Sequence, residues 1–282
     1  MKWKQIAGGV VALTALVGGL SACSDSKDPV DLTVKASSSG GKFAFDLPDE
    51  IDGGVVALTL NNVDDQPHEL ALIKVTEGTT TKQVVDQLLS TEGAPIPDFV
   101  GDVGGVGFAA PSQRVTATQE LQPGKYVYFC TFGDGDDVHY DNGMLGSVTI
   151  KGTKGKGDLP ESTESITASE YKFDIKDLKA GTHKVLFKNA GKELHHAQFF
   201  PIVEGSTIDD VKTFLATEGE PTGPPPVDFE GGVGTIVLNK GQEQVVDLTL
   251  KKGSYAVLCF MNDNAGGPPH FVQGMVQEVN VS

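Results

Sequence analysis

The sequence is short of positive charge. Lys and Arg number 22 against 38 Asp and Glu, which gives a formal net charge of −16. A chain with this excess of acid repels phosphate backbones and anionic lipid headgroups. The composition therefore argues against nucleic acid as a partner and against electrostatic docking on a membrane. Solubility of a secreted surface is the simpler reason for the acidity.

The sequence also has few cysteines and only one long apolar run. That run, Ile6 to Leu20, is followed by one of the three cysteines in Leu20-Ser-Ala-Cys23. It is too short and too rich in glycine for a transmembrane helix and fits a secretory signal better. The last four residues resemble a bacterial lipobox, which implies a lipoprotein signal peptide over residues 1–23 with the lipid on Cys23. The alternative is an ordinary signal peptide cleaved near Ala22, which leaves Cys23 free.

The rest of the chain, about 260 residues, is too long for one typical domain and suits two. Lys151-Gly-Thr-Lys-Gly-Lys-Gly-Asp-Leu-Pro160 has the composition of a linker. The expected division is a tether at 24–30, a first domain at 31–151, a linker at 152–164 and a second domain at 165–282.

An internal repeat supports this division. Residues 61–78 align without gaps on residues 188–205, and each copy continues into a Thr-Glu-Gly, an Asp-Phe and a Gly-Val-Gly. The copies are about 127 residues apart, the separation of His68 and His195, which is far above the period of a solenoid. The repeat therefore predicts two tandem domains.

Most of each copy consists of short segments with the apolar pattern of strands. One stretch in each copy, Thr81–Leu89 and Ile208–Ala216, has apolar residues at helical spacing instead. Many short strands separated by Gly and Pro indicate an all-β fold of two β-sandwiches, each with a short helical insertion. The expected strands are Val55–Leu60, Leu70–Val75, Val115–Leu121, Tyr126–Cys130, Gly146–Ile150, Lys172–Ile175, His183–Lys188, Ala197–Val203, Gln244–Leu250, Tyr255–Cys259 and Met275–Val281.

Both copies contain the same order of potential metal ligands. A Cys ends an apolar strand, a His follows after eight or ten residues, and a Met comes after four more. Another His lies far upstream, after an Asn. One thiolate, two imidazoles and a weak thioether are the ligands of a mononuclear electron-transfer copper site. The two sets are His68, Cys130, His139 and Met144 in the first copy, and His195, Cys259, His270 and Met275 in the second.

This order resembles that of the cupredoxins, the blue copper proteins, over essentially the whole mature chain. The resemblance implies two tandem cupredoxin-like Greek-key β-sandwiches, with up to two copper ions per chain. It implies that the two His and the Cys of each set are equatorial ligands and that the Met is axial. The second ligand loop, from Phe260 to Pro269, is longer than the familiar pattern, so its geometry is adapted or its site is weaker. Met261 is an alternative axial ligand there, although it lies too close to Cys259 along the chain to match the family.

Some of these residues have alternative roles. A disulfide between Cys130 and Cys259 would require the two sites to dock face to face, because the cysteines are equivalent residues of separate domains. His196 lies beside His195, and neighbouring strand residues point to opposite faces, so only one of them can face the metal. The internal alignment favours His195 and predicts that His196 points outward. His183 is expected on a surface strand.

Two-domain cupredoxins include nitrite reductases and small oxidases, so an enzyme has to be considered. Such enzymes need a second metal site rich in histidine. The chain has six His, four of them in the two sets, and no His-x-His sequence. The sequence therefore favours one-electron transfer by an extracytoplasmic protein, lipid-anchored to a bacterial membrane, with a redox protein as partner. Copper storage or delivery and a metal-free binding module are the alternatives.

Overall fold

The structure, a computed structural model, describes residues 28–91, 93–133, 137–217 and 223–282. The expected signal peptide at 1–23, with Cys23, and most of the tether lie outside the described residues. Strands dominate the described part, which confirms the all-β fold class. Within these ranges no helix has the length and apolar character needed to cross a membrane.

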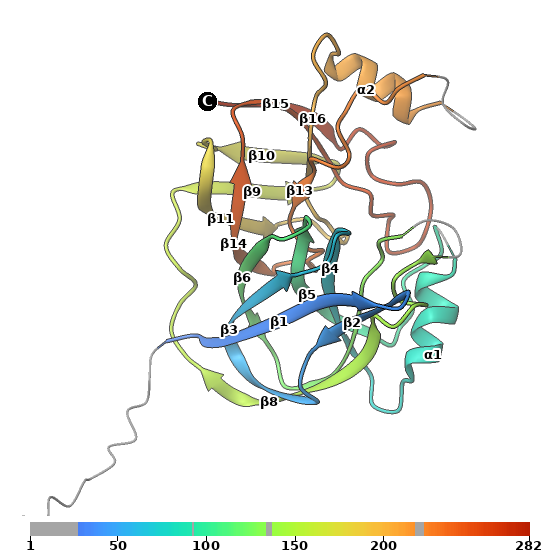
Figure 1. The fold of residues 1–282 in the computed structure, drawn as a ribbon, viewed down its shortest axis with the longest axis vertical. Coiled ribbons are helices and arrows are strands. Elements are labelled where there is room, and N and C mark those ends of the chain that lie inside the picture. Colours follow the sequence, from blue (N-terminus) through green and yellow to red (C-terminus); the bar gives the residue numbers. More distant parts are fainter. Residues whose placement is uncertain (1–27, 92, 134–136, 218–222) are drawn as a thin grey trace, which may run out of the picture.

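The first half of the described chain forms a β-sandwich (Figure 1). One sheet has the strand order β2-β1-β3-β6 and the other the order β5-β4-β7-β8. The start of β3 also pairs with β8, which joins the two sheets at one edge. The strands are β1 Val30–Ser39, β2 Lys42–Asp46, β3 Glu50–Asn62, β4 His68–Val75, β5 Val100–Ala109, β6 Arg114–Leu121, β7 Gly124–Phe129 and β8 Leu145–Gly155.

The second half repeats this arrangement strand for strand. Its sheets have the orders β10-β9-β11-β14 and β13-β12-β15-β16, so each strand has a counterpart eight places earlier. The expected pair of tandem β-sandwiches is therefore confirmed, whereas the exact domain boundaries stay a prediction. The strands are β9 Glu164–Ser169, β10 Lys172–Lys176, β11 Gly181–Asn189, β12 Gln198–Pro201, β13 Val233–Gly234, β14 Glu243–Leu250, β15 Gly253–Leu258 and β16 Val276–Val281.

Alternating burial along the strands builds the core of each sandwich. In β3, Val56, Leu58 and Leu60 are fully buried while the residues between them are partly exposed. This period of two places one face of the strand against the opposite sheet. The first and third strands of each domain run parallel, as β1 with β3 and β9 with β11. Most other neighbouring strands are antiparallel.

A helical insertion occurs in each domain, as the sequence predicts. In the first it begins as α1 (Thr81–Val84) and continues as the π-helical segment η1 (Val85–Leu89). In the second it is α2 (Ile208–Leu215). Both begin with a capping box, in which the side chain of Thr80 or Thr207 accepts from the backbone N–H three residues on. The side chain of that third residue accepts from the backbone N–H of the threonine, so the same capping box starts both helices.

The two domains contact each other through paired strands and through a close approach of their backbones. Strand β14 pairs with β6, with Val246 opposite Ala117, so one sheet of each domain continues into the other. Strands β5 and β13 also approach closely, because a Cβ on Gly107 would lie 2.6 Å from the carbonyl oxygen of Gly234. The interface therefore leaves no room for a side chain at Gly107.

Candidate metal centres

The upstream histidine of each domain is positioned by an asparagine-braced turn. Asn62 ends β3, and its Nδ2 donates to the carbonyl oxygens of Gln66 (2.7 Å) and Ala109 (2.9 Å). Its Oδ1 accepts from the backbone N–H of Asp64. Asn189 makes the same set of bonds in the second domain. This buried amide satisfies the backbone groups of the turn and fixes where the histidine enters the next strand.

The other three residues of each set come from the end of the cysteine strand and the loop after it. Cys130 directly follows β7, and its N–H donates to the carbonyl oxygen of Met144 (3.2 Å), whose own N–H donates to that of His139 (2.9 Å). The second domain repeats these bonds among Cys259, Met275 and His270. The loop therefore folds back so that the His and the Met lie beside the Cys in both domains, despite its different length.

In the first domain the donor atoms converge on one point. Nδ1 of His68 lies 3.1 Å from Nδ1 of His139, and these atoms are 3.9 Å and 3.5 Å from Sγ of Cys130. All three side chains are 1% exposed or less, and Met144 is fully buried next to them along the backbone. We call this group centre 1.

The second domain repeats the arrangement. Nδ1 of His195 lies 3.1 Å from Nδ1 of His270, and the distances to Sγ of Cys259 are 3.8 Å and 3.5 Å. These side chains and Met275 are fully buried. We call this group centre 2. Among the described residues, centres 1 and 2 are the groups of three His, Cys, Asp or Glu side chains able to hold a metal ion.

The outer ring nitrogens of centre 1 face acceptor atoms, which favours lone pairs on its inner nitrogens. Nε2 of His139 lies 3.2 Å from Oε1 of Gln66, and Nε2 of His68 lies 3.4 Å from a carboxylate oxygen of Asp64. Both contact atoms are hydrogen-bond acceptors, which favours the tautomer with the proton on Nε2 and a lone pair on Nδ1 of each ring. Two lone pairs 3.1 Å apart beside a sulfur repel each other unless a cation lies among them. The donor set fits one soft-to-borderline metal ion, and its mixture of thiol, imidazole and thioether fits copper.

Burial keeps the imidazoles neutral, as a metal ligand requires. It lowers the pKa of His68 to about 4, with the neighbouring His139 adding to the effect. The pKa of His195 is likewise lowered to about 4 by burial and by His270. Burial raises the pKa of the Cys130 thiol, and it raises the pKa of Cys259 to about 12. Each thiol therefore keeps its proton in the metal-free protein, and metal binding has to release it.

The carboxylate behind the first histidine comes from a different part of the chain in the two centres. Asp64 of the turn accepts from the N–H groups of Asp65 and Gln66 while it faces His68. The aligned residue in the second domain is Gly191. There a carboxylate oxygen of Glu170, from the turn after β9, accepts from the two corresponding N–H groups. A Cβ on Gly191 would lie 2.6 Å from that oxygen, so the missing side chain makes the space that Glu170 fills.

The second histidine also has different surroundings in the two centres. At centre 1, the ring of Phe43 covers His139, with ring centres 4.0 Å apart. At centre 2, Asp263 accepts from Nε2 of His270 (3.2 Å) and from the hydroxyl of Tyr171 (2.8 Å). A charged carboxylate therefore replaces the neutral amide of Gln66 as partner of the second histidine. Such partners orient the ring and tune a bound metal.

The remaining candidates lie outside both centres. Nδ1 of His183 is 3.1 Å from a carboxylate oxygen of Glu164, on the surface of β11. Nε2 of His196 accepts from the N–H of Phe260 (2.9 Å), and its ring is half-buried against that residue. Met261 is half-buried and contributes its carbonyl oxygen as acceptor for the N–H of His270. His196 is thus a packed contact of the cysteine strand and not a solvent-facing side chain.

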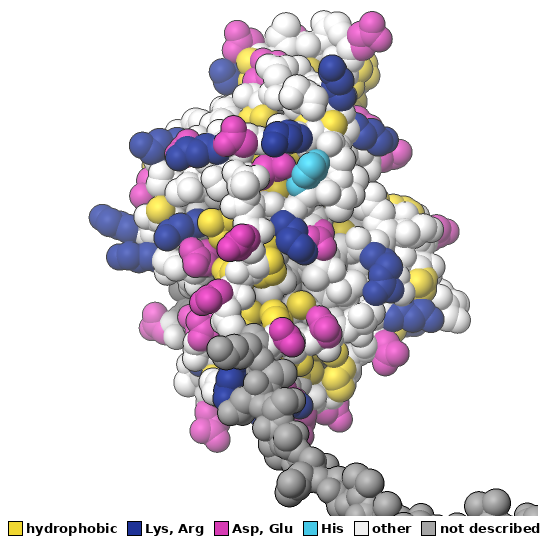
Figure 2. Space-filling model, turned by 90° about the vertical axis from the view of Figure 1, so that its left-hand side faces the viewer, with side chains coloured by type: hydrophobic (Ala, Val, Ile, Leu, Met, Phe, Trp, Pro, Cys, Tyr) yellow, Lys and Arg dark blue, Asp and Glu magenta, His cyan; other side chains and the backbone are white. Residues whose placement is uncertain are grey.

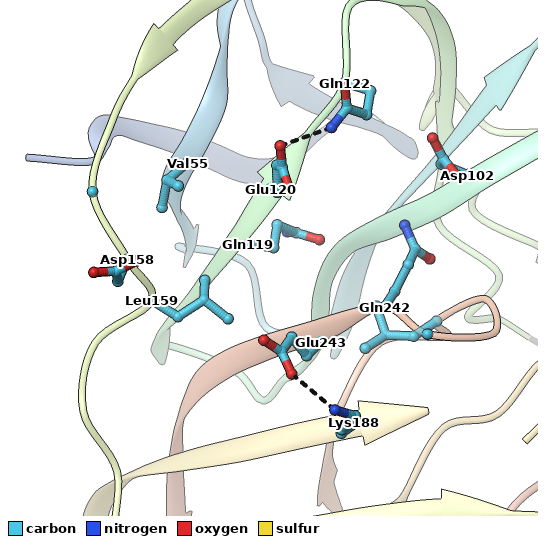
Figure 3. Close-up of a pocket in the computed structure, with 13 residues that line it drawn as sticks. Val55, Asp102, Gln119, Glu120, Gln122, Asp158, Leu159, Lys188, Gln242 and Glu243 are labelled. Atoms are coloured by element: carbon cyan, nitrogen blue, oxygen red, sulfur yellow. Dashed lines mark hydrogen bonds and ion pairs between the residues drawn. The ribbon is translucent and has the colours of Figure 1, made fainter. Parts of the chain in front are cut away.

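A pocket of about 490 Å³ lies between the domains (Figure 3). Its wall includes residues of both domains and of the linker, among them Asp102, Glu120, Asp158 and Glu243. Glu243 is paired with Lys188 at 3.6 Å, and Glu120 accepts from Gln122. None of the residues lining the pocket is a His or a Cys, so it offers no further set of soft ligands.

No family model and no curated protein matches the chain. Among solved structures it is similar to a reduced auracyanin from Roseiflexus castenholzii, at 24% identity and a TM-score of 0.29, over 43% of this chain and 97% of that one. It is similar to auracyanin A, a "blue" copper protein from Chloroflexus aurantiacus, at 22% identity and a TM-score of 0.29, over 43% and 99% of the chains. It is also similar to the copper nitrite reductase from Nitrosomonas europaea, at 15% identity and a TM-score of 0.27, over 90% and 94%.

The architecture and the donor sets lead to one description of the chain. Two sandwiches share a strand order, and in each the histidine turn and the cysteine loop meet at one end. The same atoms converge in both, at nearly the same distances. The chain therefore consists of two tandem β-sandwich domains with the same strand order, each with a buried His-Cys-His group whose donor atoms fit a copper ion.

Proposed function

We propose that the chain is an electron-transfer protein that holds one copper ion in each domain. The observation that carries the proposal is the convergence of two imidazole Nδ1 atoms and one thiol sulfur in a fully buried place, twice in one chain. Met144 and Met275 are the proposed axial ligands. Copper bound there supplies a one-electron Cu(II)/Cu(I) couple, whose potential depends on the axial ligand, burial and hydrogen bonds to the sulfur.

The protein groups around the sulfur support a redox role. The backbone N–H of Glu69 points at Sγ of Cys130 across 3.4 Å, and the N–H of the aligned His196 lowers the pKa of Cys259 in the same way. A donor aimed at the sulfur stabilises negative charge on it and so tunes the potential of a bound metal. Ligands held in place by backbone bonds also keep their positions when the charge of the metal changes.

Burial of the ligands favours electron transfer over copper delivery. Storage and delivery require the metal to enter and leave, which open ligands allow. Here His139 is 1% exposed beneath the ring of Phe43, and His270 is fully buried with Tyr171 against it edge-on. We expect such buried centres to release a metal slowly.

A redox titration with a copper chelator present tests this choice. We expect each centre to be reduced and reoxidised reversibly by one electron while the copper stays bound, because the ligand positions are fixed by the backbone. Spectroelectrochemistry monitored at the thiolate-to-copper absorption measures the couple. Rapid transfer of copper to the chelator without a reversible couple would assign the protein to copper storage or delivery.

Enzymatic reduction of nitrite or oxidation of phenols is the less favoured alternative. Either reaction needs a second copper held by several imidazoles in addition to the electron-entry centre. Only His183 and His196 remain outside the two centres, and they contact Glu164 and Phe260. We therefore expect no turnover of nitrite or phenols by the fully loaded protein in steady-state assays. Turnover that disappears in a His183→Ala or His196→Ala variant would overturn the electron-transfer assignment.

We propose further that lipid on Cys23 anchors the protein to the outer face of a bacterial membrane, where a redox protein is its partner. The support is the sequence around Cys23, whose residues the structure does not describe. Figure 2 shows acidic and basic side chains interspersed over the face that it draws, without a large patch of one sign. On that face a partner would meet a surface of mixed charge, so long-range attraction of one sign would not steer it there.

A further inference from the structure

The ligand loop of centre 2 contacts the first domain. The N–H of Ile96 donates to the carbonyl oxygen of Asn264 (2.8 Å), and the N–H of Gly267 donates to that of Gly93 (3.1 Å). Ile96 and Gly93 belong to the segment after the helical insertion of the first domain. Asn264 and Gly267 belong to the loop between β15 and β16, which descends toward that segment in Figure 1. Two backbone hydrogen bonds thus join the two segments.

The contact is tight enough to require a glycine. Gly266 has a φ of +85°, and a Cβ there would lie 2.6 Å from the carbonyl oxygen of Gly93. Gly267 has a φ of +128°, but a Cβ there would meet nothing within 4 Å. Both positions have a backbone conformation that favours glycine, yet only at Gly266 would an added Cβ meet the first domain.

The same loop carries the residue that orients a proposed copper ligand. Asp263 accepts from Nε2 of His270, and it directly precedes Asn264, the residue bonded to Ile96. Its position therefore depends on where the loop is held. At centre 1 the corresponding partner of His139 is Gln66, which comes from the histidine turn of the same domain and not from the ligand loop.

We infer that residues 93–96 of the first domain are positioning residues of centre 2. They hold the long ligand loop in place, so that Asp263 keeps the ring of His270 turned with Nδ1 toward Cys259. This inference rests on the proposed copper-binding function. It explains how a ligand loop two residues longer than that of centre 1 still delivers its histidine to the same place. It also makes centre 2 depend on both domains.

Replacing Ile96 by Pro tests the inference, because it removes the N–H that bonds to Asn264, and Ile96→Val is the control that keeps it. Both are made in a Cys130→Ser parent, so that only centre 2 can hold its full ligand set. In the metal-free protein we expect Ile96→Pro to speed exchange of the Gly267 amide by about tenfold, the loss of roughly one hydrogen bond. We also expect shifts in the imidazole NMR signals of His270. After copper loading, the visible absorption and EPR spectrum should change, while Ile96→Val matches the parent.

A second pair of variants covers the case in which Ile96→Pro does not fold. Gly266→Ala places a methyl group against Gly93, whereas Gly205→Ala introduces comparable backbone strain, at a φ of +88°, where a Cβ meets nothing within 4 Å. We expect the first to shift the His270 signals and the copper spectrum much more than the second. Equal effects of the two, or faster exchange at Gly267 with unchanged His270 signals, would overturn the inference. A parent that binds no copper would contradict the proposed function instead, and the His270 signals of the metal-free variants would still decide the role of residues 93–96.

Discussion

Cys130→Ser will remove the intense visible absorption of centre 1 and leave that of centre 2, and Cys259→Ser will do the reverse. The absorption arises from the bond between thiolate and copper, and each centre has a single cysteine. A serine hydroxyl is a hard, weakly acidic ligand, so it forms no equivalent of the copper–thiolate bond and gives no such absorption. Each single variant should retain one coloured copper per chain, and the double variant should retain none, as measured by metal analysis and visible spectroscopy.

The independence of the two centres is the physical basis of this expectation. Each draws its cysteine and both histidines from one domain, so loss of one thiol leaves the other donor set complete. Both cysteines are buried and free within the described residues. Loss of both colours from either single variant would indicate one shared site. A Cys130–Cys259 disulfide found by mass spectrometry in fresh native protein would contradict the account as well.

Cys23→Ala will move the protein from the membrane fraction to the soluble fraction of the producing cells. The proposed anchor is a lipid on that cysteine, whose buried methylenes hold the protein at the bilayer with about 0.8 kcal/mol each. No described helix could replace the anchor by spanning the membrane. The copper content and spectrum of the soluble variant should equal those of the wild type, because the domains lie beyond the tether. Immunoblotting of separated membranes measures the effect, and retention of the variant at the membrane would refute the anchor.

The duplicated architecture could be predicted because its signals are local and occur twice. The Cys, His and Met of each loop keep their order, and the apolar strands around them alternate with a period of two. The helical insertions also follow from apolar spacing, and the capping threonines Thr80 and Thr207 start them. The structure confirms the fold class and brings the sequence-identified histidines and cysteines together in each domain. Their role as copper ligands stays a prediction.

Several strands could not be read from the sequence because long-range contacts stabilise them. β5 contains four glycines and has weak strand propensity, yet it runs for ten residues. Two of these glycines are required by close approach of other backbone, and a Cβ on Gly105 would collide with the carbonyl oxygen of Leu70. Gly107 meets the backbone of the other domain in the same way. The pairing of β14 with β6 likewise depends on how the domains dock.

The surroundings of the centres were the least predictable part. Glu170 and Tyr171 reach centre 2 from a turn that is distant in sequence. Glu170 fills the space that Gly191 leaves, and Tyr171 donates a hydrogen bond to Asp263. The equivalence of the two turns is seen in the structure, where Gly40 and Gly41 join β1 to β2 as Glu170 and Tyr171 join β9 to β10. The internal repeat of the sequence does not extend to this turn, so it gave no signal for either residue.

Copper content and visible absorption of the wild-type protein after anaerobic loading with Cu(II) test the central claim most directly. The convergence of two imidazole nitrogens and one thiol in each domain, with a buried methionine in the same ligand loop, predicts two bound coppers per chain. It also predicts an intense charge-transfer absorption with contributions from both centres. A protein that stays colourless and binds no copper after loading, with both thiols free, would contradict the account.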